Sequence, residues 1–140
     1  AVDEGGWTIE DSIVLARELK KCGVDLVDCS ASGIAIRSPT ASRNVANRGF
    51  QVPYAEAIRR DADIATAAVG LIIDGLQADE ILRRQQADLI AIGREMLYDP
   101  FWAAHAAHAL GYDAEFSLMP KQYGWWLNRR TKSGFTKDAK

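Results

Sequence analysis

The stretch that decides the fold is residues 65–95, ATAAVGLIIDGLQADEILRRQQADLIAIGRE. It contains two short apolar runs, 65–73 and 87–93, separated by an amphipathic segment that suits a helix. Both runs are too short to cross a membrane and too continuously apolar for a strand with one face in water. Apolar runs of this length that alternate with helices predict parallel strands covered on both faces.

Each apolar run carries a glycine, Gly70 in the first and Gly93 in the second. A glycine where a parallel strand leads into a helix lets backbone amides approach a phosphate closely, and the helix N-terminus adds partial positive charge. The pattern therefore predicts phosphate binding at the strand ends. For Gly70 the structural alternative is an ordinary tight exit from a strand, which is compatible with the same role.

The first half of the chain predicts the same strand-and-helix alternation. A capping box at Thr8 and Asp11 begins a helix, and Gly23 ends it. Residues 24–30 follow as the first full strand. Pro53 suits the first turn of a second helix over residues 54–61, whose apolar face is expected to point inward through Ala55, Ile58 and Ala62.

The second half continues the alternation. A helix is predicted over residues 77–86 between the two apolar strands, and helical segments run from Arg94 to about Leu110 with a break at Pro100. Residues 31–51 are polar and lack periodicity. Loops of that length are uncommon in a compact domain, so this one is either a ligand lid or a solvated excursion.

Right-handed crossovers would place the three parallel strands side by side, with their carboxyl ends near Gly33, Gly70 and Gly93 along one rim. A complete (β/α)8 barrel typically needs about 250 residues, and this chain has 140. Three strands cannot close a barrel. The sequence therefore predicts an α/β fold that is either the C-terminal portion of such a barrel or a small open sheet.

The composition is that of a globular protein, with 48% hydrophobic and 26% charged residues. The net charge of −2 gives no general case for nucleic-acid binding. Six basic residues and one acidic residue give the last twenty positions a charge of +5, which leaves −7 for the rest. A solvated, partly disordered end explains this better than nucleic-acid binding does.

Two cysteines and two histidines are the remaining candidates for special chemistry. Cys22 and Cys29 are expected to be buried or half-buried thiols in a reducing compartment. His105 and His108 lie three residues apart in the last predicted helix, where one face could suggest a metal. With no carboxylate or third ligand placed nearby, solvated or packing histidines are favoured, and no metal is expected. No signal peptide or transmembrane run is recognised.

Five segments in order resemble the Old Yellow Enzyme family, closest to its branch of FMN-dependent ene-reductases that includes the bacterial xenobiotic reductases. They are EGGWT at 4–8, GVDLVD at 23–28, GFQVPYAE at 49–56, AVGLI at 68–72 and ADLIAIGRE at 87–95. The resemblance runs from Asp3 to about Trp126. It corresponds to the C-terminal part of a family member, from the end of its fifth strand through its eighth.

The resemblance implies a (β/α)8 barrel with FMN at its C-terminal rim. Hydride from NADH or NADPH reaches, through the flavin, the β-carbon of an alkene activated by a carbonyl or nitro group. In this chain, residues 1–111 would form the C-terminal part of the barrel, roughly strands six to eight with their helices. Residues 112–140 would form a tail that contacts a dimer partner and then becomes disordered.

The resemblance assigns cofactor-binding roles to four positions. Gly93 and Arg94 match the family's Gly-Arg pair, whose amides and guanidinium hold the FMN phosphate, and a dianion suits a bidentate cation. Gly70 with Leu71 matches the neighbouring turn on the phosphate side. For Arg94 the alternative is a surface salt bridge.

The resemblance also assigns a role to the tail. Residues 119–126 would reach the active-site rim of a neighbouring subunit, where Trp126, with Trp125, matches positions that cap the substrate pocket. An aromatic wall over a flavin excludes water and shapes the pocket. Ordinary packing at the interface between subunits is an equal alternative, because tryptophan is enriched at interfaces.

Catalytic residues are not assigned, because the family's substrate-binding histidines and flavin-tuning cysteine lie in the first half of the barrel. His105, His108 and Cys29 therefore inherit no role. The expected whole is a cytoplasmic, dimer-based ene-reductase acting on a small alkene, without nucleic-acid or membrane partners. The chain lacks an initiator Met and is expected to be part of something longer, with the N-terminal half of the barrel, in the same or a separate chain, as its partner.

Two other functions stay open. One is a non-catalytic half-barrel that self-associates through exposed sheet edges. The other is a different phosphate-binding barrel, such as an aldolase or a dihydrouridine synthase. A Schiff-base aldolase needs a lysine at a strand end, and none of the predicted strands contains a lysine.

Overall fold

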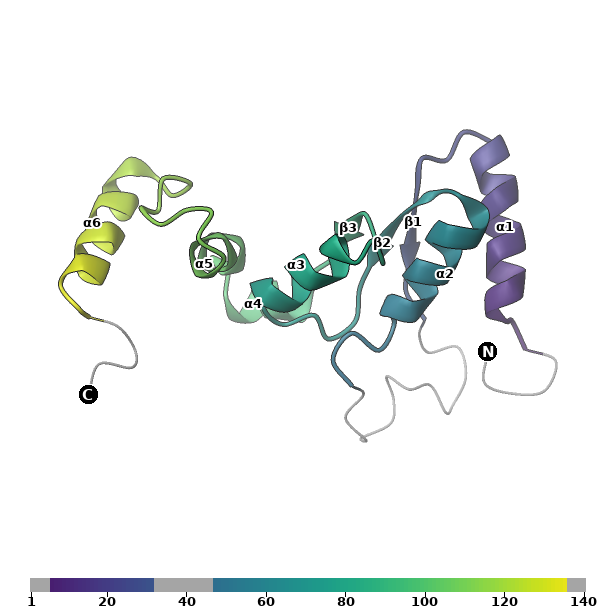
Figure 1. Ribbon diagram of the computed structural model, residues 1–140, viewed down its shortest axis with the longest axis horizontal. Coiled ribbons are helices and arrows are strands. Elements are labelled where there is room, and N and C mark those ends of the chain that lie inside the picture. Colours follow the sequence, from purple (N-terminus) through teal and green to yellow (C-terminus); the bar gives the residue numbers. More distant parts are fainter. Residues whose placement is uncertain (1–5, 32–46, 136–140) are drawn as a thin grey trace. The chain divides into compact units, whose positions relative to one another are not determined.

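The computed structural model describes residues 6–31 and 47–135 (Figure 1). The chain forms two compact units, one of Ala1–Ile73 with Gln77–Gly93 and one of Asp74–Leu76 with Arg94–Lys140. The elements are α1 (Ile9–Lys21), β1 (Leu26–Cys29), α2 (Val52–Ala62), β2 (Ala65–Ala68), α3 (Gly75–Arg83), β3 (Leu89–Ile90), α4 (Arg94–Tyr98), α5 (Trp102–Ala109) and α6 (Lys121–Lys132).

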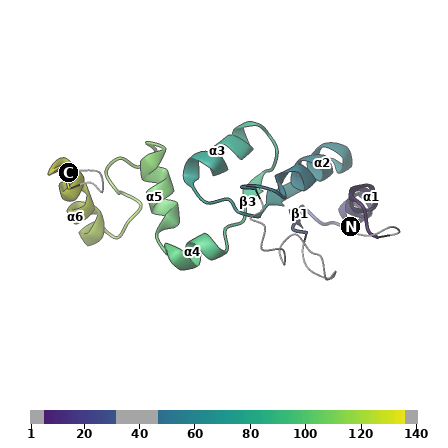
Figure 2. The ribbon, with the colours of Figure 1, turned by 90° about the horizontal axis from the view of Figure 1, so that it is seen from below.

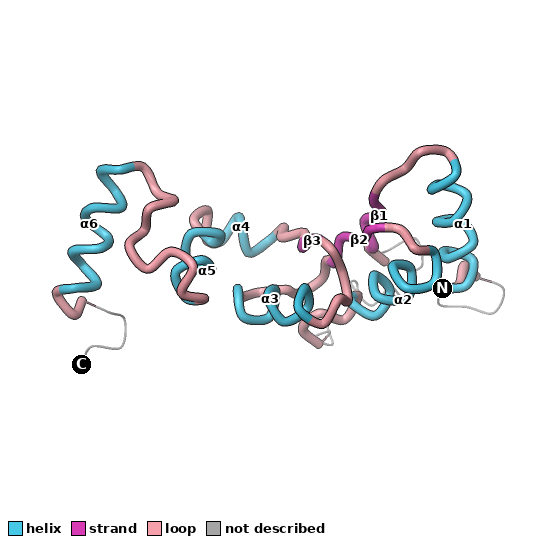
Figure 3. Tube along the Cα trace, turned by 45° about the horizontal axis from the view of Figure 1, so that its top comes forward, coloured by secondary structure: helices cyan, strands magenta, loops and turns pink. Residues whose placement is uncertain are grey.

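A parallel three-stranded sheet organises the first unit, in the order β1-β2-β3 (magenta in Figure 3). The pairing of β1 with β2 begins at Leu26 opposite Ala65, and that of β2 with β3 places Ala68 opposite Ile90. The predicted α/β class and the three adjacent parallel strands are confirmed. Because all three strands run the same way, their carboxyl ends share one edge.

All three strands are shorter than the sequence predicted. The predicted strand 65–73 ends at Ala68, because Gly70 (φ +107°) and Leu71 (φ +52°) leave the extended region. The predicted strand 87–93 contains only Leu89–Ile90 as strand. Hydrogen bonds from Asp88 N to Thr66 O (2.9 Å) and from Ala91 N to Ala68 O (2.8 Å) nevertheless continue its pairing with β2 at both ends.

Small apolar side chains form the core between the sheet and α2. Ala55, Ile58 and Ala62 of α2 are buried, which confirms the predicted inward face, and they meet the buried residues of β2. By contrast, Leu89 of β3 is 56% exposed. An exposed leucine on an edge strand is unusual on a free surface, where edges are normally charged or covered.

The predicted capping box at the start of α1 is confirmed. The backbone N–H of Asp11 donates to Thr8 Oγ1 at 3.2 Å, and the backbone N–H of Thr8 donates to Asp11 Oδ2 at 2.9 Å. The hydrogen bond from the Thr8 backbone holds the pKa of the Asp11 carboxyl below its usual value. The helix ends at Lys21, and Gly23 takes the left-handed conformation (φ +89°) that the stop signal implied.

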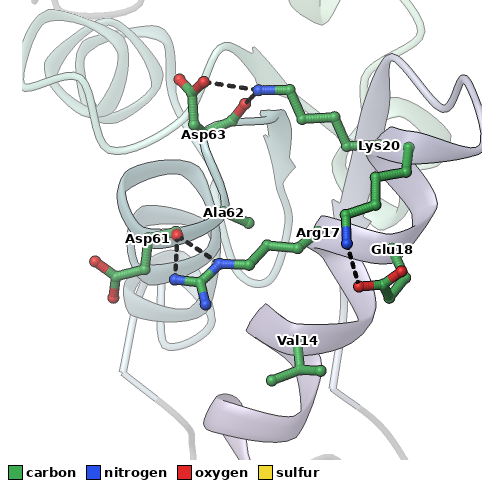
Figure 4. A pocket seen from close by; sticks show the side chains of 8 residues that line it. Val14, Arg17, Glu18, Lys20, Asp61, Ala62 and Asp63 are labelled. Carbon is green, nitrogen blue, oxygen red and sulfur yellow. Dashed lines mark hydrogen bonds and ion pairs between the residues drawn. The ribbon is translucent and has the colours of Figure 1, made fainter.

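Cations on α1 cap the C-terminal end of α2, and the two helices lie side by side (Figures 1 and 2). Arg17 donates to the carbonyl of Asp61 from Nε (3.1 Å) and Nη2 (2.7 Å). Lys20 Nζ binds the carbonyl of Asp63 and, at 2.7 Å, its carboxylate (Figure 4). Positive charge at a helix C-terminus satisfies its free carbonyls and its dipole. These residues also line a shallow surface pocket, whose polar groups thus serve to hold α1 against α2.

The two cysteines differ in environment. Cys29 is buried at the end of β1, and burial raises the pKa of its thiol to about 11. Cys22, at the end of α1, is exposed. The prediction that both are buried or half-buried is therefore wrong for Cys22, because this residue is the C-cap beyond the last turn of α1, where its side chain is left exposed.

The second unit contains a helix that the sequence analysis did not predict. The break at Pro100 is confirmed between α4 and α5, but α6 follows further along the chain, at Lys121–Lys132. A loop anchored by the buried Asp113 precedes it. The carboxylate of Asp113 accepts hydrogen bonds from Ser117 N (2.6 Å), Ser117 Oγ (2.8 Å) and Leu118 N (3.0 Å). These bonds, led by that from Leu118, lower the pKa of Asp113.

Gly124 allows α6 to pack against this loop. A Cβ at Gly124 would lie 2.4 Å from the carbonyl oxygen of Phe116. The ring of Phe116 in turn stacks on His108 of α5, with 4.1 Å between ring centroids. The chain therefore runs from α5 to α6 through one tightly packed loop. Across the described residues, the structure contains no helix with the length and apolarity needed to cross a membrane.

We predict that Thr8→Ala lowers the free energy of unfolding by about 1 kcal/mol, because it leaves helix N–H groups without an acceptor. Urea denaturation of the two proteins measures the difference. Thr8→Ser keeps the oxygen and should behave like the unsubstituted protein, so an equal loss in both variants would contradict a capping role.

We predict that Gly124→Ala releases α6 from the loop. The new Cβ would clash with the backbone carbonyl of Phe116, which cannot move aside as the end of a flexible side chain could. Backbone amides of α6 should then exchange with solvent hydrogen at least about tenfold faster, as for a segment that has lost its packing. Gln122→Ala, at an exposed position of the same helix, is the control and should not accelerate exchange. Unchanged exchange in Gly124→Ala would show that the close contact is not required.

Candidate functional site

The turn that follows β2 has an unusual backbone. Gly70 and Leu71 both have positive φ, which is uncommon for a side chain such as leucine. The backbone N–H of Gly49 donates to the carbonyl of Gly70 (3.0 Å) and to that of Leu71 (3.2 Å). Outliers of this kind persist where the surroundings enforce them, and they are frequent at ligand sites.

The amides of this turn are free for a ligand. Within the described part of the chain, the N–H groups of Gly70 and Leu71 donate to no other residue, although both carbonyls are hydrogen-bonded. Unpaired backbone N–H groups in a turn with positive φ form a typical anion-binding concavity. The geometry therefore suits a phosphate group.

Gly93 and Arg94 follow β3, the strand next to β2. Both are exposed, and apart from its two neighbours in the chain no described residue has an atom within 4 Å of the place where a Cβ of Gly93 would be. Arg94 forms no ion pair with any residue that the structure describes, so the alternative of a surface salt bridge is not found there. The open space at Gly93 and the unpaired guanidinium fit an anionic ligand.

Helix N-termini contribute less than the sequence suggested. Gly70 does not lead directly into a helix, because α3 begins at Gly75, close to its predicted start at residue 77. The helix that begins at Arg94 has five residues, and so short a helix sums few peptide dipoles. Any anion at this edge would depend on individual amides rather than on a helix dipole.

Trp125 and Trp126 lie on α6 and are 55% and 65% exposed. Their rings meet edge to face with 4.5 Å between centroids, and the guanidinium of Arg129 lies 5.4 Å from the centroid of Trp125. Such an exposed aromatic surface suits either a cover over a substrate or an interface with another subunit.

The two histidines have local partners. His105 Nδ1 lies 2.6 Å from Asp99 Oδ2, so the expectation that no carboxylate is near this histidine is wrong. His108 stacks on Phe116, and its Nδ1 lies 3.1 Å from the carbonyl oxygen of Asp113. Among the residues that the structure describes, no three potential metal ligands come together. Packing explains His108, and a contact with the carboxylate of Asp99 explains His105.

Sequence reasoning missed two glutamines beside the turn. Gln51 is 5% exposed, and Gln77 binds the backbone of Leu71 and Ile73. The available signal was a polar residue placed between the apolar Phe50 and Val52. Of the other predicted features, Gly33 and most of the polar segment 31–51 lie outside the described residues.

Comparison with known proteins gives a family match over most of the chain. The model of the NADH:flavin oxidoreductase / NADH oxidase family matches residues 2–113. Relatives named NADPH dehydrogenase are 51% identical over 108 residues in Halalkalibacterium halodurans, 45% over 120 in a Geobacillus species and 47% over 119 in Listeria innocua.

These alignments cover 77%, 86% and 85% of this chain and 30%, 34% and 33% of the respective relatives. The chain thus spans about a third of the length of the curated relatives it matches. FMN is the flavin cofactor of the matched family, and reduced nicotinamide is its reductant. The resemblance seen in the sequence is confirmed: the chain belongs to the NADH:flavin oxidoreductase / NADH oxidase family.

Proposed function

We propose that this chain supplies the FMN-phosphate end of an NAD(P)H-dependent oxidoreductase that reduces alkenes activated by a carbonyl or nitro group. The observation that carries the proposal is the turn at Gly70 and Leu71, whose amides donate to no described residue. It follows one strand of a parallel sheet, and Gly93 and Arg94 follow the neighbouring strand. Ligands of parallel sheets bind at this edge.

The roles of the four residues follow from their chemistry. The N–H groups of Gly70 and Leu71 would donate to phosphate oxygens, Gly93 would leave room for close approach, and Arg94 would supply a bidentate cation. Bound FMN supplies the hydride-transfer chemistry, while the protein supplies binding and orientation. The residues that would orient and protonate the alkene are proposed to lie outside this chain.

The three-stranded sheet supports the placement of this chain in a larger barrel. We propose that residues 1–111 form the C-terminal part of a (β/α)8 barrel, corresponding roughly to strands six to eight. The half-exposed Leu89 belongs to a strand whose one partner among the described residues is β2. A further strand from the N-terminal half of the barrel would cover it and pair with its free edge.

The tail is proposed to act at a second subunit. In a dimer of the cytoplasmic enzyme, residues 112–140 would reach the neighbouring active site, with Trp126 and Trp125 against its substrate pocket. Their exposure and their edge-to-face packing support this role. Aromatic side chains that become buried when two subunits associate typically dominate the binding energy of the interface.

The second candidate is a half-barrel that self-associates without flavin, which the exposed Leu89 also favours. The flavin content of the purified protein discriminates between the two candidates. A Schiff-base aldolase is disfavoured, because β1, β2 and β3 contain no lysine.

We predict that the full-length protein shows a flavin absorbance band and that an α,β-unsaturated ketone accelerates its oxidation of NADPH. Arg94→Gln should weaken FMN binding by about ten- to hundredfold, the usual effect of losing hydrogen bonds to a charged group. Added FMN should then restore the activity, because the substitution removes only cofactor affinity.

Arg84→Gln is the matched control. Arg84 is exposed and pairs with Glu80 on α3, so its loss should leave FMN affinity unchanged. A protein that purifies without flavin and does not bind added FMN would contradict the proposed function and favour the self-associating half-barrel.

A further inference from the structure

The side chain of Gln51 spans the distance between the end of β1 and the turn that follows β2. Its Oε1 accepts a hydrogen bond from the backbone N–H of Ala31, just beyond β1. Its Nε2 packs against Gly70, where a Cβ would lie only 2.5 Å away. Gln51 is 5% exposed, and a buried amide that is held in this way has little freedom to move.

A second amide holds the same turn from α3. Gln77 Nε2 donates to the carbonyl of Leu71 at 3.3 Å, and Gln77 Oε1 accepts from the N–H of Ile73 at 3.0 Å. Gly49 is the third residue that holds the turn, since its backbone N–H donates to the carbonyls of Gly70 and Leu71. A Cβ at Gly49 would lie 3.2 Å from Gln77 Nε2, so these groups are in close contact.

Holding the carbonyls also orients the free amides. In a trans peptide unit the C=O of one residue and the N–H of the next point in opposite directions, and no described peptide bond is cis. The carbonyl of Gly70 is bound by Gly49, so the N–H of Leu71 points to the opposite side. The donor needed by an anion is therefore aimed before any ligand arrives.

The positive φ of Leu71 makes this support necessary. A leucine in the left-handed region costs of the order of 1–2 kcal/mol relative to ordinary backbone. A peptide flip at this turn would relieve that cost but would turn a carbonyl towards the anion. The hydrogen bond from Gly49 to the Gly70 carbonyl opposes this flip directly. The packing of Gln51 against Gly70 and the hydrogen bond from Gln77 to the Leu71 carbonyl restrict the residues on either side of the same peptide.

We propose that Gln51 and Gln77, hereafter the amide pair, are positioning residues that preset the turn at Gly70 and Leu71 for the phosphate of FMN. The inference rests on the proposed function. The amide pair acts through the backbone: Gln77 holds the Leu71 carbonyl, and Gln51 fills the space beside Gly70. Both keep the turn in the conformation in which Gly49 orients the N–H that Leu71 supplies. Preorganised donors bind tightly because no reorganisation is needed when the ligand arrives.

The test compares FMN with riboflavin, which has the same ring system but no phosphate. Affinities of the full-length apoprotein for both are measured by the quenching of flavin fluorescence. Gln51→Met retains the size of the side chain but removes its hydrogen bond, and it should weaken FMN binding about tenfold, the usual effect of losing one well-placed hydrogen bond. Riboflavin binding should change less than about twofold. Gln77→Met should give the same selective loss.

Gln86→Met is the matched control, because Gln86 also forms a hydrogen bond in the first unit, to Glu56 Oε2 at 3.0 Å, but does not contact the turn. It should leave both affinities unchanged. An unchanged ratio of FMN to riboflavin affinity in Gln51→Met and Gln77→Met would overturn the proposal. An equal loss of affinity for FMN and for riboflavin would also overturn it, since that result indicates general loss of structure.

Arg94→Gln separates this inference from the function on which it rests. If that substitution selectively weakens FMN while the amide-pair variants do not, the positioning role is wrong and the phosphate site stands. If the unsubstituted protein binds FMN no better than riboflavin, the phosphate site itself is wrong and the positioning role falls with it. If Gln51→Met does not fold, Gln77→Met decides between the outcomes.

Discussion

The central position of β2 is the constraint on which the first unit depends. Parallel pairing with β1 on one side and β3 on the other places the three carboxyl ends on a single edge. The small buried side chains of Thr66, Ala67 and Ala68 let α2 pack closely against this strand. The turn at Gly70 and the exposed Gly93 therefore follow neighbouring strands at the same edge, and the candidate anion site is a consequence of strand direction.

The turn after β2 shows how the fold sustains an unfavourable backbone. Leu71 has a left-handed conformation that its side chain disfavours. The groups that hold the turn come from both sides of it in the chain: Gly49 and Gln51 from the segment that leads into α2, and Gln77 from α3, six residues after Leu71. Each contributes a hydrogen bond or close packing that an extended strand would not need. The enclosed carbonyls and the unpaired N–H groups are two results of the same arrangement.

The second unit depends on its own local interactions. The carboxylate of Asp113 gathers three donors from Ser117 and Leu118, which keeps it ionised and fixes the loop. That loop presents the carbonyl of Phe116 to Gly124, and the contact sets where α6 lies within the unit. The exposed face of Trp125 and Trp126 follows from this packing. Asp113 thus helps to position Trp125 and Trp126 through the loop that it anchors, although it does not belong to α6.

Elements with strong local signals were predictable from the amino-acid sequence. The capping box of α1, the inward face of α2 and the break at Pro100 depend on residues within a few positions of one another, and all three were predicted. The alternation of apolar runs with helices was sufficient for the parallel sheet, and short motifs identified the family. The ends of the strands, the burial of Gln51 beside Gly70 and the formation of α6 were not predictable in this way. These features depend on contacts between residues far apart in the chain, or, for α6, on packing that outweighs a weak helical pattern containing a glycine.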